Sequence, residues 1–152
     1  MHRIIISDTS CLIALQNIGL LDVLQKLFGE IIITTEVKIE YGESLPDWII
    51  VTKVNNIDKQ LELEDKLDKG EASSLALALE IANSTLIIDE IKGRKIAQSL
   101  KVNIIGTLGV LVLAKKQGVI HDLIGTLLRL VNSGFRMSDL MINKIIEEYG
   151  EK

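Results

Sequence analysis

The sequence contains few of the residues on which several classes of small protein depend. Its 152 residues include one cysteine, Cys11, and two histidines, His2 and His121. A single cysteine excludes an internal disulfide framework, and these three residues are too few for a zinc site built from cysteine and histidine. Because 47% of the residues are hydrophobic, we expect residues 1–152 to fold as one domain around an apolar core.

Basic charge and aromatic side chains are also scarce. The formal net charge is -4, and 3% of the residues are aromatic. This charge excludes a broad basic surface that binds nucleic acid by electrostatic attraction alone. The few aromatic residues argue against a platform on which the bases of a single strand stack. If the protein acts on nucleic acid, something other than its net charge has to attract the phosphates.

Long apolar runs are missing as well. The longest uncharged run in the second half, residues 102–114, contains Asn103 and two glycines, whereas a membrane-spanning helix needs about 20 apolar residues. Asp8 interrupts the apolar N-terminus and no small-residue cleavage site follows, so we expect no signal peptide. Together with the single cysteine, this predicts a cytoplasmic protein. The mean hydropathy of +0.31 is high for a small soluble monomer, which favours a homodimer.

Short runs rich in isoleucine and valine alternate with segments of helical periodicity. The runs predict buried strands at residues 3–7, 31–34, 48–53, 85–88 and 102–105. Helices are predicted at residues 10–28 with a break at Gly19, and at 71–82, 108–116, 120–131 and 138–149, with shorter ones after the second and fourth strands. We therefore predict a doubly wound α/β fold with a mostly parallel five-stranded sheet and helices on both faces.

Acidic residues follow several of the predicted strands. In a doubly wound sheet, ligands bind outside the carboxyl ends of the strands, so the residues directly after each strand are candidates for a site. The acids are Asp8 after the first strand, Glu36 and Glu40 after the second, Asp89 and Glu90 after the fourth, and Glu71 at the start of the helix before the fourth.

A simpler interpretation explains most of these residues one at a time. Acids are favoured in the first turn of a helix, where the helix dipole stabilises each by roughly 0.3–1 kcal/mol. In the same way, Ser10 and Thr107 are explained as plain N-caps. Glu90 and Arg94 have the spacing of a surface ion pair within one helix.

Glu40 fits the simpler interpretation least well. It lies in the body of its predicted helix, where we expect it to share one face with Glu36 and Glu43 and to have only Lys38 as a nearby cation. Like charges stacked in this way destabilise a helix, and carboxylates gathered at one sheet edge raise one another's pKa. A divalent cation removes this conflict, and ligation by oxygen alone selects Mg²⁺ or Mn²⁺ over zinc.

Six short motifs, in this order along the chain, resemble those of the PIN-domain ribonuclease superfamily. The resemblance extends to a branch of short prokaryotic PIN proteins similar to VapC toxins, and it covers nearly the whole chain. The motifs are D-T-S at residues 8–10, V-K-I-E at 37–40, K-G-E-A-S at 69–73, I-I-D-E-I-K-G-R at 87–94, V-N-I-I-G-T-L-G-V-L at 102–111 and G-F-R-M-S at 134–138.

The resemblance implies a Mg²⁺- or Mn²⁺-dependent endoribonuclease that cuts single-stranded RNA. It implies that Asp8, Glu40, Glu71 and Asp89 are the catalytic, metal-binding acids. Glu90 stands where this branch usually has a second aspartate, so either Asp89 or Glu90 is expected to reach the metal, and Glu90 is a fifth candidate ligand.

The resemblance also implies contacts beyond the acids. Ser10 matches a hydroxyl residue near the metal. Lys92, Arg94 and Lys95 are candidates for binding the phosphates of the RNA, with a solvated helix face as the alternative. Similarity to toxins implies a small antitoxin protein as partner.

Two functions other than a nuclease stay open at this point. One is a non-catalytic PIN-like subunit that only binds or regulates. The other is a receiver-like signalling module with a Mg²⁺ site, although its acceptor aspartate is expected after the third strand, which here ends in Thr52-Lys53. A haloacid-dehalogenase phosphatase is excluded, because it needs a second aspartate where Ser10 stands.

Overall fold

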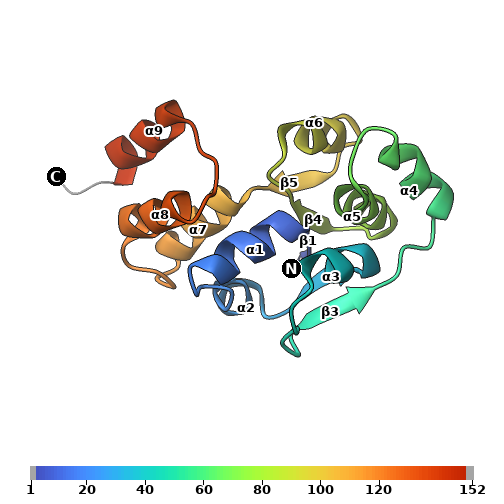
Figure 1. The fold of residues 1–152 in the computed structure, drawn as a ribbon, viewed down its shortest axis with the longest axis horizontal. Helices are drawn as coiled ribbons and strands as arrows, with labels where there is room; N and C mark the ends of the chain where they lie inside the picture. The colour runs from blue at the N-terminus through green and yellow to red at the C-terminus, as the bar shows by residue number, and fades with distance from the viewer. Residues whose placement is uncertain (1–2, 150–152) are drawn as a thin grey trace.

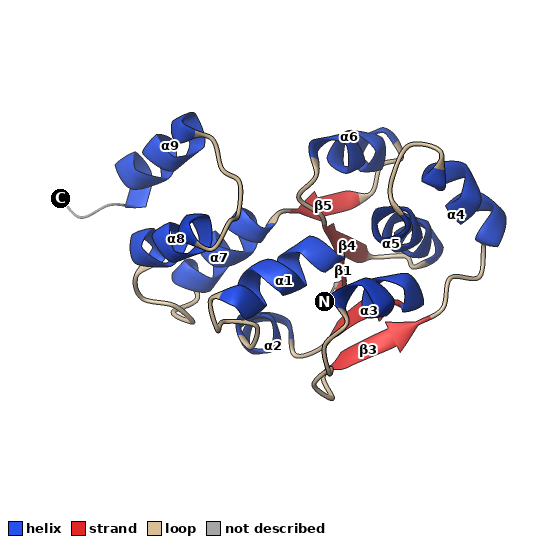
Figure 2. Cartoon of the chain, viewed as in Figure 1, coloured by secondary structure: helices blue, strands red, loops and turns tan. Residues whose placement is uncertain are grey.

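The computed structural model describes residues 3–149, and its centre is a five-stranded sheet in which every strand pairs in parallel with its neighbours (Figure 2). The order across the sheet is β3-β2-β1-β4-β5. The strands are β1 (Ile4–Ser7), β2 (Ile31–Thr34), β3 (Ile49–Thr52), β4 (Ser84–Ile87) and β5 (Asn103–Ile105). The predicted five-stranded parallel sheet is confirmed. His2 lies outside the described residues.

Helices connect the strands and continue beyond the last one. They are α1 (Thr9–Asn17), α2 (Val23–Phe28), α3 (Thr35–Tyr41), α4 (Ile57–Glu64), α5 (Lys69–Glu80), α6 (Ile91–Ser99), α7 (Thr107–Lys116), α8 (Leu123–Asn132) and α9 (Asp139–Tyr149). Within residues 3–149, none of these helices has both the length and the apolar character needed to cross a bilayer.

The helices cover both faces of the sheet, because side chains of a strand point alternately to its two sides. In β1, Ile5 belongs to the apolar cluster shared with α1, α2, α7 and α8, whereas Ile6 belongs to the cluster shared with α5 and α6. Figure 1 shows α1 and α2 on one side of the sheet and α5 and α6 on the other. The predicted doubly wound arrangement is therefore confirmed.

Some helices differ from the prediction in their boundaries, and one was not predicted at all. The segment 10–28 ends its first helix at Asn17, and Gly19, with φ 72°, lies in the turn before α2. Helix α5 begins at Lys69 because Asp68 caps it. Helix α4 was not predicted, because it is a surface helix that buries only Gln60 and Leu63 and so lacks an apolar stripe.

The strand order brings distant parts of the chain to one point. The chain leaves β1 towards β2 and β3, then returns to add β4 and β5 on the other side of β1. Strands β1 and β4 are neighbours, and Ser7 pairs with Ile87 at their carboxyl ends. This reversal creates the crevice in which doubly wound folds bind ligands. Asp8 and Asp89 follow these two strands.

Candidate metal centre

An open pocket of about 590 Å³ lies at the carboxyl edge of the sheet. Six carboxylates line it, together with two hydroxyl residues, two apolar residues and one arginine. These are Asp8, Glu40, Asp68, Glu71, Asp89, Glu90, Thr9, Ser10, Ile13, Phe135 and Arg136. The structure thus brings all five acids predicted as metal ligands to one pocket, and adds a sixth.

Asp8 lies at the N-cap position of α1, but its side chain forms no capping hydrogen bond. It is 4% exposed. The pKa of Asp8 is raised to about 8, chiefly by burial, and the nearby charges of Glu71, Asp68 and Glu40 contribute to the increase. A helix-capping role therefore does not explain Asp8, whereas a cation beside it would relieve both causes of the raised pKa.

Glu71 does cap a helix, but it is also part of the acidic cluster. The backbone N–H of Glu71 donates to Asp68 Oδ1 at 2.8 Å, and the N–H of Asp68 donates to Glu71 Oε1 at 3.3 Å. This capping box explains why α5 begins where it does. Burial raises the pKa of Glu71 to about 7, with the charges of Asp68 and Glu90 acting in the same direction.

Glu43 does not share a face with Glu36 and Glu40, so that part of the prediction is wrong. Helix α3 ends at Tyr41 and Gly42 adopts φ 70°, which places Glu43 outside the helix. Glu36 turns towards α4, where it accepts a hydrogen bond from Gln60 Nε2 at 2.7 Å. Glu40 instead accepts from Thr9 Oγ1 at 2.5 Å and reaches the pocket.

The close approach of α3 to α5 depends on a glycine. A Cβ at Gly70 would lie 2.9 Å from Cδ of Glu40, a separation that real side chains essentially never show. The missing side chain at Gly70 thus makes room for the Glu40 carboxylate directly beside Glu71.

Asp89 and Glu90 have different neighbours although they are adjacent in sequence. Asp89 Oδ1 accepts from the N–H of Thr107 at 2.7 Å, and Asp89 Oδ2 accepts from Thr107 Oγ1 at 2.6 Å and Ser10 Oγ at 3.3 Å. Glu90 caps α6, because its Oε2 accepts from the N–H of Lys92 at 2.6 Å and of Gly93 at 3.2 Å. Asp89 is therefore positioned by α1 and α7, and Glu90 by its own helix.

A comparison with protein-family models gives a match to the PIN domain over residues 4–151. The chain belongs to the PIN-domain family. PIN domains form a superfamily of nucleases, which are hydrolases, and they generally use divalent metal ions. No match is found among curated proteins or solved structures. Membership of the PIN family excludes the receiver-like alternative, and β3 indeed lies at the edge of the sheet rather than beside the pocket.

The donors of this PIN domain suit a hard cation. Every charged side chain of the pocket that could ligate a metal is a carboxylate, and oxygen-only sites bind Mg²⁺ or Mn²⁺. As they stand within residues 3–149, no three of the aspartate, glutamate, histidine and cysteine side chains are grouped closely enough to hold an ion. The chemistry of the donors fits a cation, and the carboxylates would have to come closer together to ligate it.

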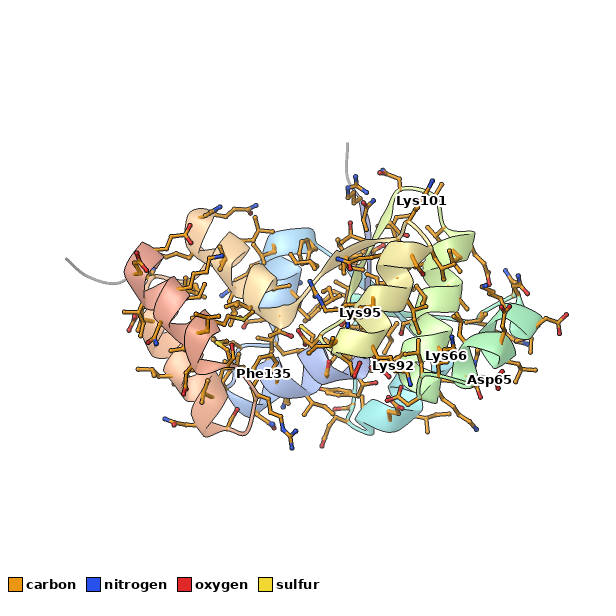
Figure 3. The ribbon with its side chains drawn as sticks, turned by 90° about the horizontal axis from the view of Figure 1, so that it is seen from above. Asp65, Lys66, Lys92, Lys95, Lys101 and Phe135 are labelled. Carbon is orange, nitrogen blue, oxygen red and sulfur yellow. The ribbon has the colours of Figure 1, made fainter. Side chains whose placement is uncertain are left out.

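The three basic residues predicted to bind phosphate are placed differently. Lys92 and Lys95 are exposed on α6, as Figure 3 shows. Arg94 is half-buried and donates from Nη1 to the carbonyl of Ile88 at 2.7 Å. Within the described chain it forms no ion pair with Glu90, so the surface-pair interpretation of Glu90 is wrong. Arg94 supports the loop after β4, because Ile88 directly precedes Asp89.

Sequence reasoning placed Ser10 near the metal but missed several other residues of this site. Thr107 and Ser10 are not N-caps, because Gly106 and Asp8 occupy those positions, and both hydroxyls bind Asp89 instead. Asp68 could have been predicted as the N-cap of the helix that contains Glu71, since D-K-G-E has the spacing of a capping box. For Phe135 and Arg136 the only signal in the sequence was their place in the G-F-R-M-S motif. No spacing rule connects them to Asp8, because about 125 residues lie between.

Proposed function

We propose that this PIN domain is a metal-dependent endoribonuclease that hydrolyses phosphodiester bonds of single-stranded RNA. The observation that carries the proposal is the convergence of Asp8, Glu40, Glu71 and Asp89 on one pocket from four separate elements. Burial and mutual repulsion raise the pKa of Asp8 and Glu71, which is typical of residues arranged for function rather than for stability.

The acidic side chains would hold one or two Mg²⁺ or Mn²⁺ ions, with Glu90 as a fifth ligand. A bound divalent cation supplies positive charge that activates water and stabilises the attacking and leaving oxygens of the phosphodiester. Thr9 orients Glu40, while Ser10 and Thr107 orient Asp89 through the hydrogen bonds described above.

The substrate phosphates need cationic partners outside the acidic cluster. Lys92 and Lys95 are exposed on α6 and follow Glu90 within the next five residues. They are therefore the proposed partners for phosphates that flank the cleaved bond. Arg94 is proposed to act indirectly, because its guanidinium already binds the carbonyl of Ile88.

A toxin role, with a small antitoxin protein as partner, is proposed on the resemblance of the six motifs to VapC-like proteins. A homodimer is proposed on the high mean hydropathy and on apolar side chains exposed along α8 and α9. These are Leu128, Leu140, Met141 and Ile146. A cytoplasmic location is proposed on the single, buried cysteine.

The test is cleavage of end-labelled single-stranded RNA with Mn²⁺ or Mg²⁺, with and without EDTA. We expect metal-dependent cutting that Asp8→Asn and Glu40→Gln each reduce at least 100-fold. Asp58→Asn is the matched control, since Asp58 is an exposed acid in the first turn of α4, outside the pocket. Cutting that resists EDTA, or an Asp8→Asn variant as active as Asp58→Asn, would refute the proposal. Metal binding without cutting would indicate the non-catalytic subunit instead.

A further inference from the structure

A second cavity adjoins the acidic pocket and shares part of its wall. It has a volume of about 330 Å³ and lies between α1 and the segment that joins α8 to α9. Ser10, Ile13, Phe135 and Arg136 line both cavities. The two cavities therefore form one groove, which begins at the carboxylates and runs along α1 towards Asn17.

The position of Phe135 in this groove is determined by the end of α8. The N–H of Gly134 donates to the carbonyl of Val131 at 3.0 Å, and the N–H of Phe135 donates to that of Leu130 at 3.2 Å. These two bonds form a Schellman motif, in which Gly134 adopts φ 111°. The Phe135 side chain, labelled in Figure 3, packs partly against the core and also lines the groove.

Ile13 provides a second apolar surface in the same groove. It lies on α1 and is 42% exposed, although its neighbours Leu12 and Ala14 are buried. An exposed isoleucine that lines the same cavities as a half-buried phenylalanine offers a flat group two apolar contacts at once. Nucleic-acid bases are flat, and stacking on an aromatic side chain contributes roughly 1–3 kcal/mol per base whatever its identity.

Arg136 is the one cation among the residues that line the acidic pocket. Its side chain is exposed, and within residues 3–149 it forms no hydrogen bond or ion pair, despite six carboxylates around the same cavity. An arginine that neutralised these acids would pair with at least one of them. Its guanidinium is instead available for a planar, bidentate contact with a phosphate.

We propose that Phe135, Ile13 and Arg136 form a nucleotide subsite for single-stranded RNA next to the metal centre. The base stacks on Phe135 against Ile13, and Arg136 binds the phosphate of the same nucleotide. This inference rests on the proposed nuclease function and adds a residue-level account of how the substrate is held. It also explains how a chain with few aromatic residues binds a single strand, because one well-placed ring acts in place of a platform.

The first experiment measures kcat and KM on a labelled single-stranded RNA of 12 nucleotides with Mn²⁺. Phe135→Leu keeps an apolar side chain against the core but removes the ring, and we expect KM to rise about 10-fold with little change in kcat. Phe28→Leu is the matched control, because Phe28 is also half-buried against the same core and does not line the groove. Its KM is expected to equal that of the wild type.

The second experiment tests the phosphate contact through salt. Arg136→Ala is expected to raise KM about 10-fold and to reduce the slope of log KM against log salt by about 0.7, the value for one phosphate of a single strand. Lys144→Ala removes an exposed cation from α9 and is the control. A purely structural role for Arg136 would leave the salt slope unchanged.

The third experiment moves an abasic nucleotide through the RNA, one position at a time. At one position the abasic nucleotide is expected to raise the KM of the wild type about 10-fold. The KM of Phe135→Leu, which is already raised by the mutation, should increase little further at that position. If every position affects both proteins equally, Phe135 does not stack on a base and the proposal is overturned.

Binding of the same RNA with Ca²⁺, followed by fluorescence anisotropy, separates this inference from the nuclease function. If the wild type cuts RNA and both groove variants match their controls, the subsite is overturned and the nuclease stands. If the wild type binds without cutting and both variants bind at least 10-fold more weakly, the subsite stands and the nuclease function fails. A wild type that neither binds nor cuts overturns both, and leaves the groove as a surface for a protein partner.

Discussion

Asp8 is buried at the start of α1 beside other carboxylates, and this position costs folding free energy when the side chain is ionised. Burial removes the water that stabilises the charge, and Glu71, Asp68 and Glu40 add repulsion. This destabilising arrangement lies directly after β1, where the strand order reverses. A cation at that point would turn the same carboxylates from mutually repelling groups into ligands.

The raised pKa predicts how the stability of the metal-free protein depends on pH. The pKa of Asp8 is about 8 in the folded protein, against the ordinary value of 3.8 in the unfolded chain, so the folded state binds more protons between these values. Stability therefore falls as pH rises from about 4 to 8. Glu71, with a pKa of about 7 against 4.5, acts in the same direction.

Asp8→Asn should remove most of this dependence. In EDTA at pH 8 we expect the variant to be more stable than the wild type by about 2 kcal/mol, which raises Tm by roughly 4–8 °C. At pH 4 the two proteins should differ much less in Tm, since Asp8 is neutral in the folded state and only partly ionised in the unfolded state. Calorimetry at both pH values, with Asp58→Asn as control, checks this. A wild type whose stability changes between pH 4 and 8 in the same way as that of the variant would contradict this prediction.

At the scale of elements, the start of α5 combines a structural role with a charge that disturbs the site. Asp68 caps the helix through the N–H of Glu71, and its charge raises the pKa of both Glu71 and Asp8. Asparagine is as good an N-cap as aspartate, whereas alanine is not. The cap and the charge can therefore be removed separately.

Asp68→Ala should lower stability at pH 5 by about 1 kcal/mol, because α5 loses its cap. Asp68→Asn should leave stability at pH 5 unchanged and increase it at pH 8, because the cap remains and the repulsion is gone. Thermal unfolding in EDTA at the two pH values measures both effects. Equal losses for the alanine and asparagine variants would show that the charge of Asp68, and not its cap, stabilises the helix.

The contact between α3 and α5 provides a second prediction at this scale. Alanine at Gly70 raises helix propensity by about 1 kcal/mol but displaces the exposed Glu40 carboxylate. We expect Gly70→Ala to keep its Tm and to lose about 10-fold in Mn²⁺ affinity, measured by calorimetric titration. The effect should largely disappear in a Glu40→Gln background. A loss of the same size in that background would mean that Gly70 acts on something other than Glu40.

At the scale of the whole molecule, the metal and the fold are thermodynamically linked. The proposed ligands come from the N-cap of α1, from α3 and α5, and from the loop after β4, so they are together only in the folded chain. An ion that binds only the folded state stabilises it by about 2.7 kcal/mol at 100 times its Kd. Ion binding also displaces protons from Asp8 and Glu71, so the apparent affinity should rise with pH.

We therefore expect Mn²⁺ at 100 times its Kd to raise the Tm of the wild type by roughly 5–10 °C at pH 7.5. Asp58→Asn should respond like the wild type, and Asp8→Asn should not respond. Scanning fluorimetry across a Mn²⁺ titration gives the shift directly. An equal shift in all three proteins would place the ion outside the acidic pocket.

The amino-acid sequence was sufficient to predict the sheet and most helices, because their signals are local. Isoleucine-rich runs mark strands, although the edge strand β3 leaves Ile50 and Val51 exposed, and the acids that follow the strands lie at the carboxyl edge in any parallel sheet. Helix α4 escaped prediction because its burial rests on Gln60 and Leu63 alone, which form no apolar stripe. The shared face of Glu36, Glu40 and Glu43 was wrongly predicted because the end of α3 at Gly42 was not recognised.

By itself, the sequence determined the fold class, the absence of a zinc or disulfide framework and the identity of the candidate acids. These follow from residue types and from spacings of a few positions, which local sterics and burial convert into structure. Only the tertiary structure decided that Glu40 lies against Gly70, that Thr107 binds Asp89, and that Phe135 and Arg136 line the same pocket as the carboxylates. Those contacts join segments far apart in the chain, and their geometry depends on how whole elements pack.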